Sequence, residues 1–395
     1  MITVVGIGAD GWEGLDERAR TAVLDADLLV GGERQLALVP DDGGRAQRRA
    51  WPKPLLGFVD ELAGFDGAVC VLASGDPMLH GIGATLVRRL GPQRLRVIPH
   101  ISAHAFACAR LGWPAADVEL VSAVSRPAEV VAPALAPGRR LVVYVSGPTG
   151  AAEVARVTRD RGFGASRLVV LEELGGPKER IEDSTADGWG EREAAPLHAV
   201  ALEVRGHGPL LGRTPGLSDD AYEHDGQITK RDVRAITLAA LVAVPGQLLW
   251  DIGAGSGSVA IEWLRAAPGA RAVAIERDTK RAQRIHRNAL TLGVPSLEVV
   301  NAAAPAALVG LPAPDAIFVG GGLTADGLLE RCRDALAPGG RLVANAVTVE
   351  GEGVLARAHG QWGGRLVRLA VAHAQPLGSY TAWRPAMAVT QWELR

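Results

Sequence analysis

Short apolar runs rich in valine, isoleucine and leucine alternate with helix-like segments along most of this chain. The runs in the first half are "ITVVGIG", "GAVCVLASG", "LRVIPH", "RRLVVYVSG", "RLVVLEEL" and "LHAVALEV"; those in the second half are "QLLWDIG", "ARAVAIE", "LEVVNAA", "DAIFVGG" and "RLVANAV". Continuous apolar strands separated by helices are typical of parallel sheets that are covered on both faces. We therefore predict α/β architecture with mostly parallel sheets, ending in an antiparallel strand at "MAVTQWEL".

One segment interrupts this alternation. Residues 206 to 227, "GHGPLLGRTPGLSDDAYEHDGQ", are rich in glycine, proline and acidic residues, and a chain of 395 residues is long enough for two or three domains. We predict a first domain over 1–206, a linker over 207–227 and a second domain over 228–395. The second domain should begin with a helix at about 230–243.

Composition limits the classes of partner. The formal net charge of −2 gives no basic excess for nucleic acid or an anionic membrane. The three cysteines lack the short paired spacings of zinc sites, and no apolar run approaches the ~20 residues that span a bilayer. We expect a cytoplasmic protein that binds no nucleic acid, membrane or metal.

A glycine-rich loop follows the strand "LLWDI" in the second half. Gly253, Gly255 and Gly257 precede a helix that begins near Ser258, so backbone amides and the helix N-terminus can approach a ligand. Glycines alone indicate a ligand site and an empty turn about equally. Glu276, at the end of the next strand, adds a carboxylate that can accept both hydroxyl hydrogens of a ribose. The D-x-G-x-G-x-G spacing favours S-adenosyl-L-methionine over NAD, although a generic NAD- or nucleotide-binding protein stays an alternative.

The motifs of the second half resemble a known enzyme family. "GQITKRDVRA", "LWDIGAGSGSVAIE", "AIERD", "APAAL" and "PDAIFVGGG" are similar to the class I methyltransferases of cobalamin biosynthesis that methylate carbon 15 of a precorrin and decarboxylate it. The resemblance implies a Rossmann-like domain. It also implies that S-adenosyl-L-methionine binds to Thr229, Gly253, Ala254, Gly255, Ser256, Gly257, Glu276 and Ala304.

The first half resembles the tetrapyrrole (class III) methyltransferases, which consist of two α/β subdomains. "VVGIGADGWEGL", "LASGDPMLHGIG", "VIPHISAHAFACARLG", "VYVSGPTG" and "EELGGPKERI" carry the likeness, and His100 stands where the family usually has glycine. In that family the methyl donor is held mostly by backbone groups. The matching positions are Ala9, Gly75, Asp76, Leu79, Ser102, Ala103 and Val145.

Together the two halves are similar to fused methyltransferases that act on precorrin-6Y. The resemblance implies methylation at carbons 5 and 15 and loss of the carbon 12 acetate carboxyl group, giving precorrin-8X; a cobalt-precorrin substrate and a non-catalytic tetrapyrrole carrier are the alternatives. It also implies a homo-oligomer.

The residues for chemistry are less specific. Methyl transfer needs mainly alignment of donor and acceptor. We expect Asn345 and Glu350 to face the substrate, with Glu350 as the acid for decarboxylation, although a solvated glutamate explains the same position. Lys230, Arg231 and Arg234 are expected to bind substrate carboxylates, or else to be solvated helix charges. Thr229 is the expected N-cap of their helix. His100 and His104 fit a polar pocket lining better than a metal site.

Overall fold

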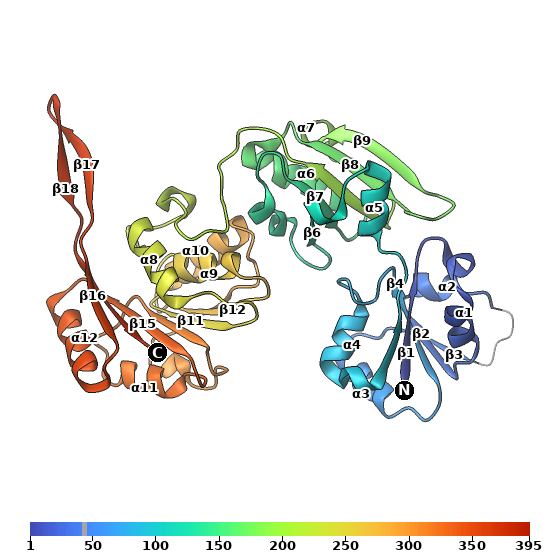
Figure 1. The fold of residues 1–395 in the computed structure, drawn as a ribbon, viewed down its shortest axis with the longest axis horizontal. Coiled ribbons are helices and arrows are strands. Elements are labelled where there is room, and N and C mark those ends of the chain that lie inside the picture. The colour runs from blue at the N-terminus through green and yellow to red at the C-terminus, as the bar shows by residue number, and fades with distance from the viewer. Residues whose placement is uncertain (42–45) are drawn as a thin grey trace. The chain divides into compact units, whose positions relative to one another are not determined.

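The chain divides into two compact units in the computed structural model, which describes residues 1–41 and 46–395. Unit 1 comprises Met1–Ala128 and Pro137–Gly208, and unit 2 comprises Glu129–Ala136 and Pro209–Arg395. Figure 1 shows both units as layered α/β structures. The predicted two-domain α/β class is confirmed.

Unit 1 begins with a five-stranded parallel sheet in the order β3-β2-β4-β1-β5. Apolar side chains fill both of its faces: α3 and α4 pack on one face, and α1 and α2 on the other. Burial on both faces explains why β1 and β4 read as continuous apolar runs. The elements are β1 (Ile2–Ile7), α1 (Glu17–Leu24), β2 (Leu28–Gly31), α2 (Glu33–Ala37), β3 (Gln47–Ala50), α3 (Leu55–Ala63), β4 (Val69–Ser74), α4 (Ile82–Leu90) and β5 (Leu95–Ile98).

The second sheet of unit 1 has the order β6-β7-β10-β8-β9. Only β6 and β7 pair in parallel, because β10 lies between β7 and β8 and runs antiparallel to both. The expectation of mostly parallel pairing is therefore wrong for this sheet. Its elements are α5 (Ala103–Leu111), β6 (Val118–Ser122), β7 (Arg140–Tyr144), α6 (Gly150–Thr158), β8 (Arg167–Glu172), β9 (Arg180–Thr185), α7 (Ala186–Trp189) and β10 (His198–Glu203).

Unit 2 contains a seven-stranded sheet in the order β13-β12-β11-β14-β15-β19-β16. Helices α8, α9 and α10 contribute to the core on one face, and α11 and α12 to the core on the other. The C-terminal strand β19 is antiparallel to β15 and β16, as predicted. A hairpin of β17 and β18 projects from the sheet (Figure 1). The strands are β11 (Leu248–Ile252), β12 (Arg271–Ile275), β13 (Glu298–Val300), β14 (Ala316–Val319), β15 (Arg341–Ala346), β16 (Arg365–Leu369), β17 (Ala372–Leu377), β18 (Tyr380–Pro385) and β19 (Val389–Leu394); the helices are α8 (Arg231–Leu241), α9 (Ser258–Ala266), α10 (Thr279–Thr291), α11 (Leu328–Ala335) and α12 (Val349–Trp362).

The expected linker over 207–227 is corrected by the structure. From Pro209 onward the chain belongs to unit 2, and Leu217 and Tyr222 are buried in its core. The carboxylate of Glu262 on α9 accepts hydrogen bonds from the Gly216 and Leu217 amides at 2.6 and 3.1 Å. A few buried side chains and hydrogen bonds thus hold this segment in the fold of unit 2, although its composition is typical of a linker.

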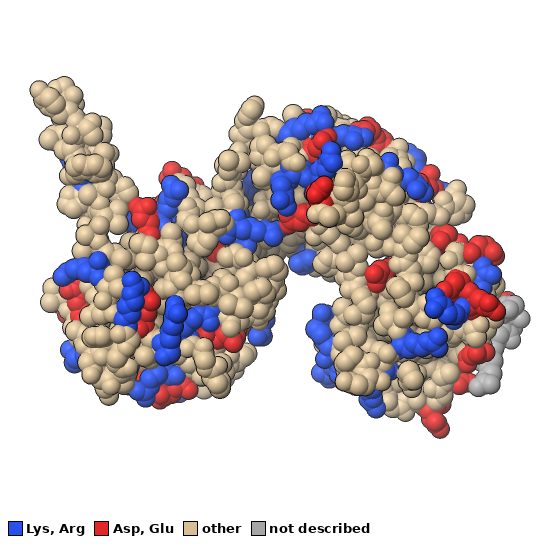
Figure 2. Space-filling model, in the orientation of Figure 1, with Lys and Arg blue, Asp and Glu red and all other residues tan. Residues whose placement is uncertain are grey.

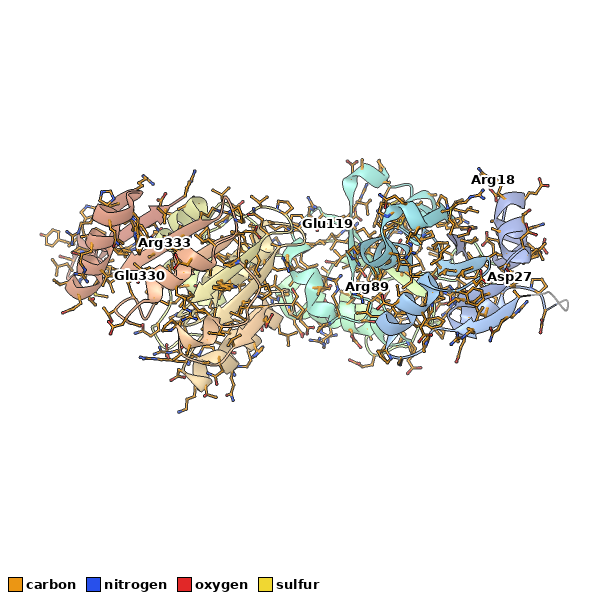
Figure 3. All side chains as sticks on the ribbon, turned by 90° about the horizontal axis from the view of Figure 1, so that it is seen from below. Arg18, Asp27, Arg89, Glu119, Glu330 and Arg333 are labelled. Carbon is orange, nitrogen blue, oxygen red and sulfur yellow. The ribbon has the colours of Figure 1, made fainter. Side chains whose placement is uncertain are left out.

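Charged side chains of both signs are interspersed on the surface. Figure 2 shows Lys and Arg next to Asp and Glu over each unit, and in Figure 3 Arg18 lies at the outer end of α1. Within residues 1–41 and 46–395, no helix is long and apolar enough to cross a membrane. The same residues contain no group of three His, Cys, Asp or Glu side chains placed to hold a metal ion.

Candidate active site

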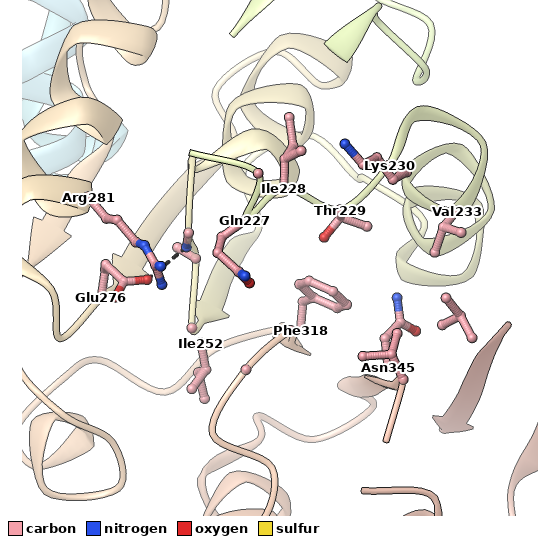
Figure 4. A pocket seen from close by; sticks show the side chains of 18 of the residues that line it. Gln227, Ile228, Thr229, Lys230, Val233, Ile252, Glu276, Arg281, Phe318 and Asn345 are labelled. Carbon is pink, nitrogen blue, oxygen red and sulfur yellow. Dashed lines mark hydrogen bonds between the residues drawn. The ribbon is translucent and has the colours of Figure 1, made fainter. Parts of the chain in front are cut away.

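One edge of the unit 2 sheet carries a cavity of about 1020 Å³. Strands β11, β12, β14, β15 and β16 all end at this edge, because they run in the same direction. The carboxyl ends of such strands are the usual ligand-binding edge of an open α/β sheet. Figure 4 shows Glu276 and Arg281 on one side of the cavity, Asn345 on the other and Phe318 between them.

The glycine loop after β11 forms one wall of the cavity. Gly253, Gly255 and Gly257 have φ angles of 69°, 60° and 77°, in the left-handed region that favours glycine. A Cβ at Gly253 would lie 2.6 Å from the Gly321 Cα, and one at Gly255 would lie 2.9 Å from the Gln227 carbonyl oxygen. These positions therefore require glycine for both conformation and space.

Asp251 holds the loop from below. Its Oδ2 accepts a hydrogen bond of 3.0 Å from the Ala260 amide in the first turn of α9, whereas its Oδ1 has no partner among the described residues. The side chain is buried. Burial raises the pKa of this carboxyl group to about 7.

Glu276 joins the loop to the end of β12. Its Oε2 accepts from the Gly255 amide at 2.8 Å and its Oε1 from the Asp278 amide at 3.0 Å. Both carboxylate oxygens retain further lone pairs, and the residue lines the cavity. The carboxylate therefore positions the loop and also offers acceptors to a ligand.

Asn345 faces the cavity from the end of β15 and is held by two partners. Its amide nitrogen donates to the Thr237 hydroxyl at 3.0 Å, and its Oδ1 accepts from the Gln391 amide at 3.0 Å. Gln391 also donates to Thr237. This network connects α8, β15 and β19 and fixes the orientation of Asn345.

The structure gathers most of the residues singled out in the second half around this one cavity. Lining residues among them are Thr229, Lys230, Arg231, Gly253, Ala254, Gly255, Glu276, Ala304 and Asn345. Ser256 and Gly257 belong to the loop but are not among the lining residues: the Ser256 side chain is buried, and Gly257 is the N-cap of α9. Thr229 is not the N-cap of α8, because the helix begins at Arg231 after Lys230.

Arg234 is corrected as a substrate-binding residue. Its side chain is 0% exposed on the inner face of α8, where Nε donates to Glu262 at 2.7 Å and Nη1 donates to Asp219 at 3.0 Å. Nη1 also donates to the Thr229 carbonyl at 2.6 Å. Arg234 thus stabilises the fold beneath the cavity wall and is not available to bind a substrate carboxylate.

Glu350 does not line the cavity either. It lies exposed in the first turn of α12, where its negative charge interacts favourably with the helix dipole. The expectation that it faces the substrate is corrected.

Several lining residues were not singled out from the sequence. The motif "VGGG" could have predicted three of them, because Gly320, Gly321 and Gly322 follow β14 in the same way as the first glycine loop follows β11. Arg281 is held by Asp225 at 3.0 Å, and this arginine keeps the pKa of the Asp225 carboxyl group well below its usual range. Other lining residues are Gln227, Arg277, Ala302, Ala303, Phe318, Val347, Val371, His373, Met387 and Val389.

In unit 1, the residues singled out from the sequence come from loops after neighbouring strands. Gly75, with φ of 56°, donates its amide to the Ile7 carbonyl at 3.0 Å, which connects the loops after β4 and β1. A Cβ at Gly75 would be 3.7 Å from the Ser102 Cα and 3.9 Å from the Ala103 amide. Asp76 stabilises its own turn by accepting from the Met78 amide at 2.8 Å. Leu79 closes the same turn.

The second sheet of unit 1 approaches these loops. The Tyr144 hydroxyl at the end of β7 accepts from the His104 amide in α5 at 2.9 Å. A Cβ at Gly176 would lie 2.7 Å from the Ala9 carbonyl oxygen. Val145, next to Tyr144, lines a separate cavity of about 400 Å³ with Ser146. The Tyr144 side chain and the Gly176 backbone therefore bring the second sheet next to the loops after β5 and β1.

The histidine that replaces the usual glycine is accommodated by an acidic partner. His100 Nε2 lies 3.2 Å from the Asp10 carboxylate in the first loop, and the imidazole is almost completely buried. His104 lies on α5, which begins at Ala103, so the two histidines do not share a helix.

Comparisons with known proteins match the two halves of the chain separately. Residues 1–188 match the family model of tetrapyrrole (corrin/porphyrin) methylases, and residues 220–395 match the precorrin methyltransferase domain. A cobalt-precorrin-7 C(5)-methyltransferase from Salmonella typhimurium is 38% identical over 46% of this chain and 89% of its own length. A probable cobalt-precorrin-6B C(15)-methyltransferase (decarboxylating) from Pyrobaculum calidifontis is 33% identical over 45% of this chain and 96% of its own length.

A third relative spans both units. The precorrin-6Y C(5,15)-methyltransferase (decarboxylating) from Sinorhizobium sp is 47% identical to this chain over 99% of the chain and 95% of the relative. Identity at this level over nearly the full length shows common family membership. The chain therefore belongs to the precorrin-6Y C(5,15)-methyltransferases (decarboxylating), enzymes of cobalamin biosynthesis.

Proposed function

We propose that each unit binds one S-adenosyl-L-methionine, that unit 1 methylates carbon 5 of the precorrin, and that unit 2 methylates carbon 15 and removes the carbon 12 acetate carboxyl group. The product of these steps is precorrin-8X. The observation that carries the proposal for unit 2 is the cavity of about 1020 Å³ between the glycine loop and Asn345. The family models over residues 1–188 and 220–395 support the division of labour.

The residues of unit 2 fit the proposed methyl donor. Gly253, Ala254 and Gly255 line the cavity and offer backbone groups to the donor, and Glu276 offers carboxylate oxygens to the ribose hydroxyls. Backbone at Ala302 to Ala304 is available to the adenine edge. When bound, the donor supplies a methyl group already activated by a sulfonium, so the chain needs to align the acceptor carbon and to exclude water.

The opposite side of the cavity fits a flat, partly apolar acceptor that carries carboxylates. Phe318, Val347 and Val389 supply apolar surface there. Lys230 and Arg231, at the start of α8, supply positive charge for propionate and acetate groups. Asn345, fixed by Thr237 and Gln391, can orient the ring by hydrogen bonds.

In unit 1, we place the donor against the backbone of the loops after β1, β4, β5 and β7. Gly75 supports this placement, because it has no side chain where its loop faces the backbone of Ser102 and Ala103. Ala9, Asp76, Leu79 and Val145 complete the proposed set.

We also propose that the protein is a homo-oligomer. The β17–β18 hairpin supports this, because Leu377, Tyr380 and Trp383 on it are exposed. Figure 2 shows little charge on this arm. Light scattering of the full chain, compared with a Trp383→Ser variant, tests the proposal. A monomeric wild-type protein would contradict it.

Calorimetry with S-adenosylhomocysteine tests the two donor sites. We expect two sites per chain and no heat from NAD. A Glu276→Gln variant should weaken one site about tenfold through the lost ribose acceptor. Glu298→Gln, an exposed residue at the start of β13, is the matched control. A wild-type titration with no binding would refute the proposal.

Product mass tests the reaction. Incubation with precorrin-6Y and S-adenosyl-L-methionine should add two methyl groups and remove one carbon dioxide. Omission of cobalt throughout distinguishes the precorrin substrate from its cobalt form. A product that gains methyl groups but keeps its carboxyl group would refute the decarboxylation assigned to unit 2.

A further inference from the structure

His373 lines the cavity of unit 2 from the side farthest from the glycine loop. It is the second residue of β17, just beyond the end of β16 at the sheet edge. Although several strands separate β16 from β11, the His373 side chain turns back toward α8. Its Nε2 lies 3.4 Å from Oδ2 of Asp232, three residues after Thr229. His373 therefore faces the same cavity as the glycine loop after β11.

Decarboxylation needs an acid in this cavity. Of the carboxylates that line the cavity, Glu276 holds the glycine loop and Asp219 is paired with the buried Arg234. The other two, Asp220 and Asp232, are exposed, and Asp232 faces His373. Histidine is the side-chain type that ordinarily both takes up and releases a proton near neutral pH. His373 is the one histidine that lines the cavity in the part of the chain that the structure describes.

Nearby charges suit such a role. Asp232 places a carboxylate oxygen 3.4 Å from the imidazole, where it can orient the ring as a carboxylate partner does for a catalytic histidine. In the hairpin, Arg384 lies directly opposite His373, so the two residues share one face of the arm. A guanidinium there can hold a substrate carboxylate while the neighbouring imidazolium delivers its proton.

We infer that His373, oriented by Asp232, is the general acid of the decarboxylation, an inference that rests on the proposed function of unit 2. In this step the bond between the acetate methylene carbon and its carboxylate breaks, and carbon dioxide leaves. The electron pair passes into the conjugated macrocycle and returns to the methylene carbon, which forms a new C–H bond with the proton from His373, so that the acetate becomes a methyl group. The neutral imidazole then regains a proton from water.

Chemical rescue tests this role. The side chains of His373 and Asp232 are 58% and 48% exposed, so added imidazole can reach the space left by a His373→Ala substitution. We expect release of carbon dioxide from precorrin-6Y to slow about 100-fold or more in this variant, the usual range for loss of a general acid. Added imidazole should restore the rate in proportion to its concentration. An Asp232→Asn variant should slow release about tenfold.

Matched measurements separate this inference from the proposed function. His359→Ala, which removes an exposed histidine of α12, should leave the rate unchanged with or without imidazole. S-adenosylhomocysteine binding by His373→Ala should stay within threefold of wild type. Carbon dioxide release within threefold of wild type, or a slow variant that binds the donor but does not respond to imidazole, would overturn the assignment of His373. Failure of the wild-type chain to bind S-adenosylhomocysteine would instead overturn the proposed function.

Discussion

Units 1 and 2 differ in how they form their candidate donor sites. In unit 2 one loop, 253–257, supplies most of the backbone surface, and a single carboxylate, Glu276, fixes it. In unit 1 the surface comes from loops after strands of two sheets, which approach each other closely, as at Gly176 and Ala9. A site formed by one loop depends on the support beneath that loop, whereas a distributed site depends on the spacing between loops.

Arg234, Glu262 and Asp219 form a buried ion network beneath the unit 2 cavity. Removal of Arg234 should have the largest effect on the stability of unit 2. Arg234→Ala leaves the Glu262 carboxylate buried without its cation, which typically costs about 3–5 kcal/mol. We expect the unfolding free energy of unit 2 to fall by that amount. Hydrogen exchange of peptides from α8 and α9 measures it.

An exposed pair provides the control for the buried one. Arg287→Ala removes the ion pair with Glu223, in which both side chains are about half exposed, and should cost about 0–1 kcal/mol. A loss below 1 kcal/mol for Arg234→Ala would show that the buried network does not support the cavity.

The glycine loop of unit 2 should be nearly as sensitive. In Gly253→Ala the new Cβ overlaps the Gly321 backbone, and the residue keeps a φ near 69° that alanine rarely adopts. Strain of about 3 kcal/mol corresponds to roughly 100-fold weaker binding. Calorimetry with S-adenosylhomocysteine should then detect only one site, in unit 1. Gly360→Ala on α12, where a Cβ meets open space, should keep both.

The corresponding test in unit 1 is Gly6→Ala on β1. Its Cβ would lie 2.2 Å from the Gly75 carbonyl oxygen and 2.7 Å from the His100 amide, so the loops after β4 and β5 must separate. The φ of Gly6 is not left-handed, so only the overlap contributes, and we expect about 30-fold weaker binding at one site. The same calorimetry should show the unit 2 site intact. Loss of both sites, or of neither, would contradict independent sites; Gly57→Ala on α3 is the control.

The sequence predicted the two units and the loop of unit 2 because these signals are local. The runs that became β1, β4 and β11 are apolar, since both sheet faces are covered. Strands such as β9 and β17 were missed, because they lie at sheet edges or in an exposed hairpin and have no continuous apolar run. Periodicity cannot detect a strand without a buried face.

The candidate residues divide in the same way. The loop 253–257 and Glu276 follow one another at a recognisable spacing, so the sequence was enough to single them out as candidates. Arg234 was misassigned because a basic residue on an amphipathic helix usually faces solvent, whereas Glu262 provides a buried partner. His373 was missed because its contact with Asp232 joins residues far apart in the chain. Only the folded chain brings such pairs together.

The smallest predicted effect concerns Asp251, whose burial raises its carboxyl pKa to about 7. The unfolded chain loses this proton near pH 4, so between about pH 4 and 7 the folded state binds more protons than the unfolded state. The unfolding free energy of unit 2 should therefore fall as pH rises through this window, by about 1 kcal/mol from pH 5 to 6, and level off above pH 7. Asp251→Asn should remove this slope in hydrogen exchange of β11 peptides.

A second carboxylate of the same unit, Asp225, should make the unfolding free energy depend on pH in the opposite direction. Arg281 lowers the pKa of Asp225, so this residue stabilises the folded state above about pH 4, and the stabilisation is lost as pH falls below that value. The unfolding free energy of Asp225→Asn should therefore be lower than that of wild type near neutral pH and approach the wild-type value in acid. The unfolding free energy of Asp251→Asn should instead rise relative to wild type as pH rises. If both variants shifted in the same direction, the pH dependence would reflect the net charge of unit 2. Opposite slopes would show that the two carboxylates act separately, Asp251 below the glycine loop and Asp225 at the cavity rim through Arg281.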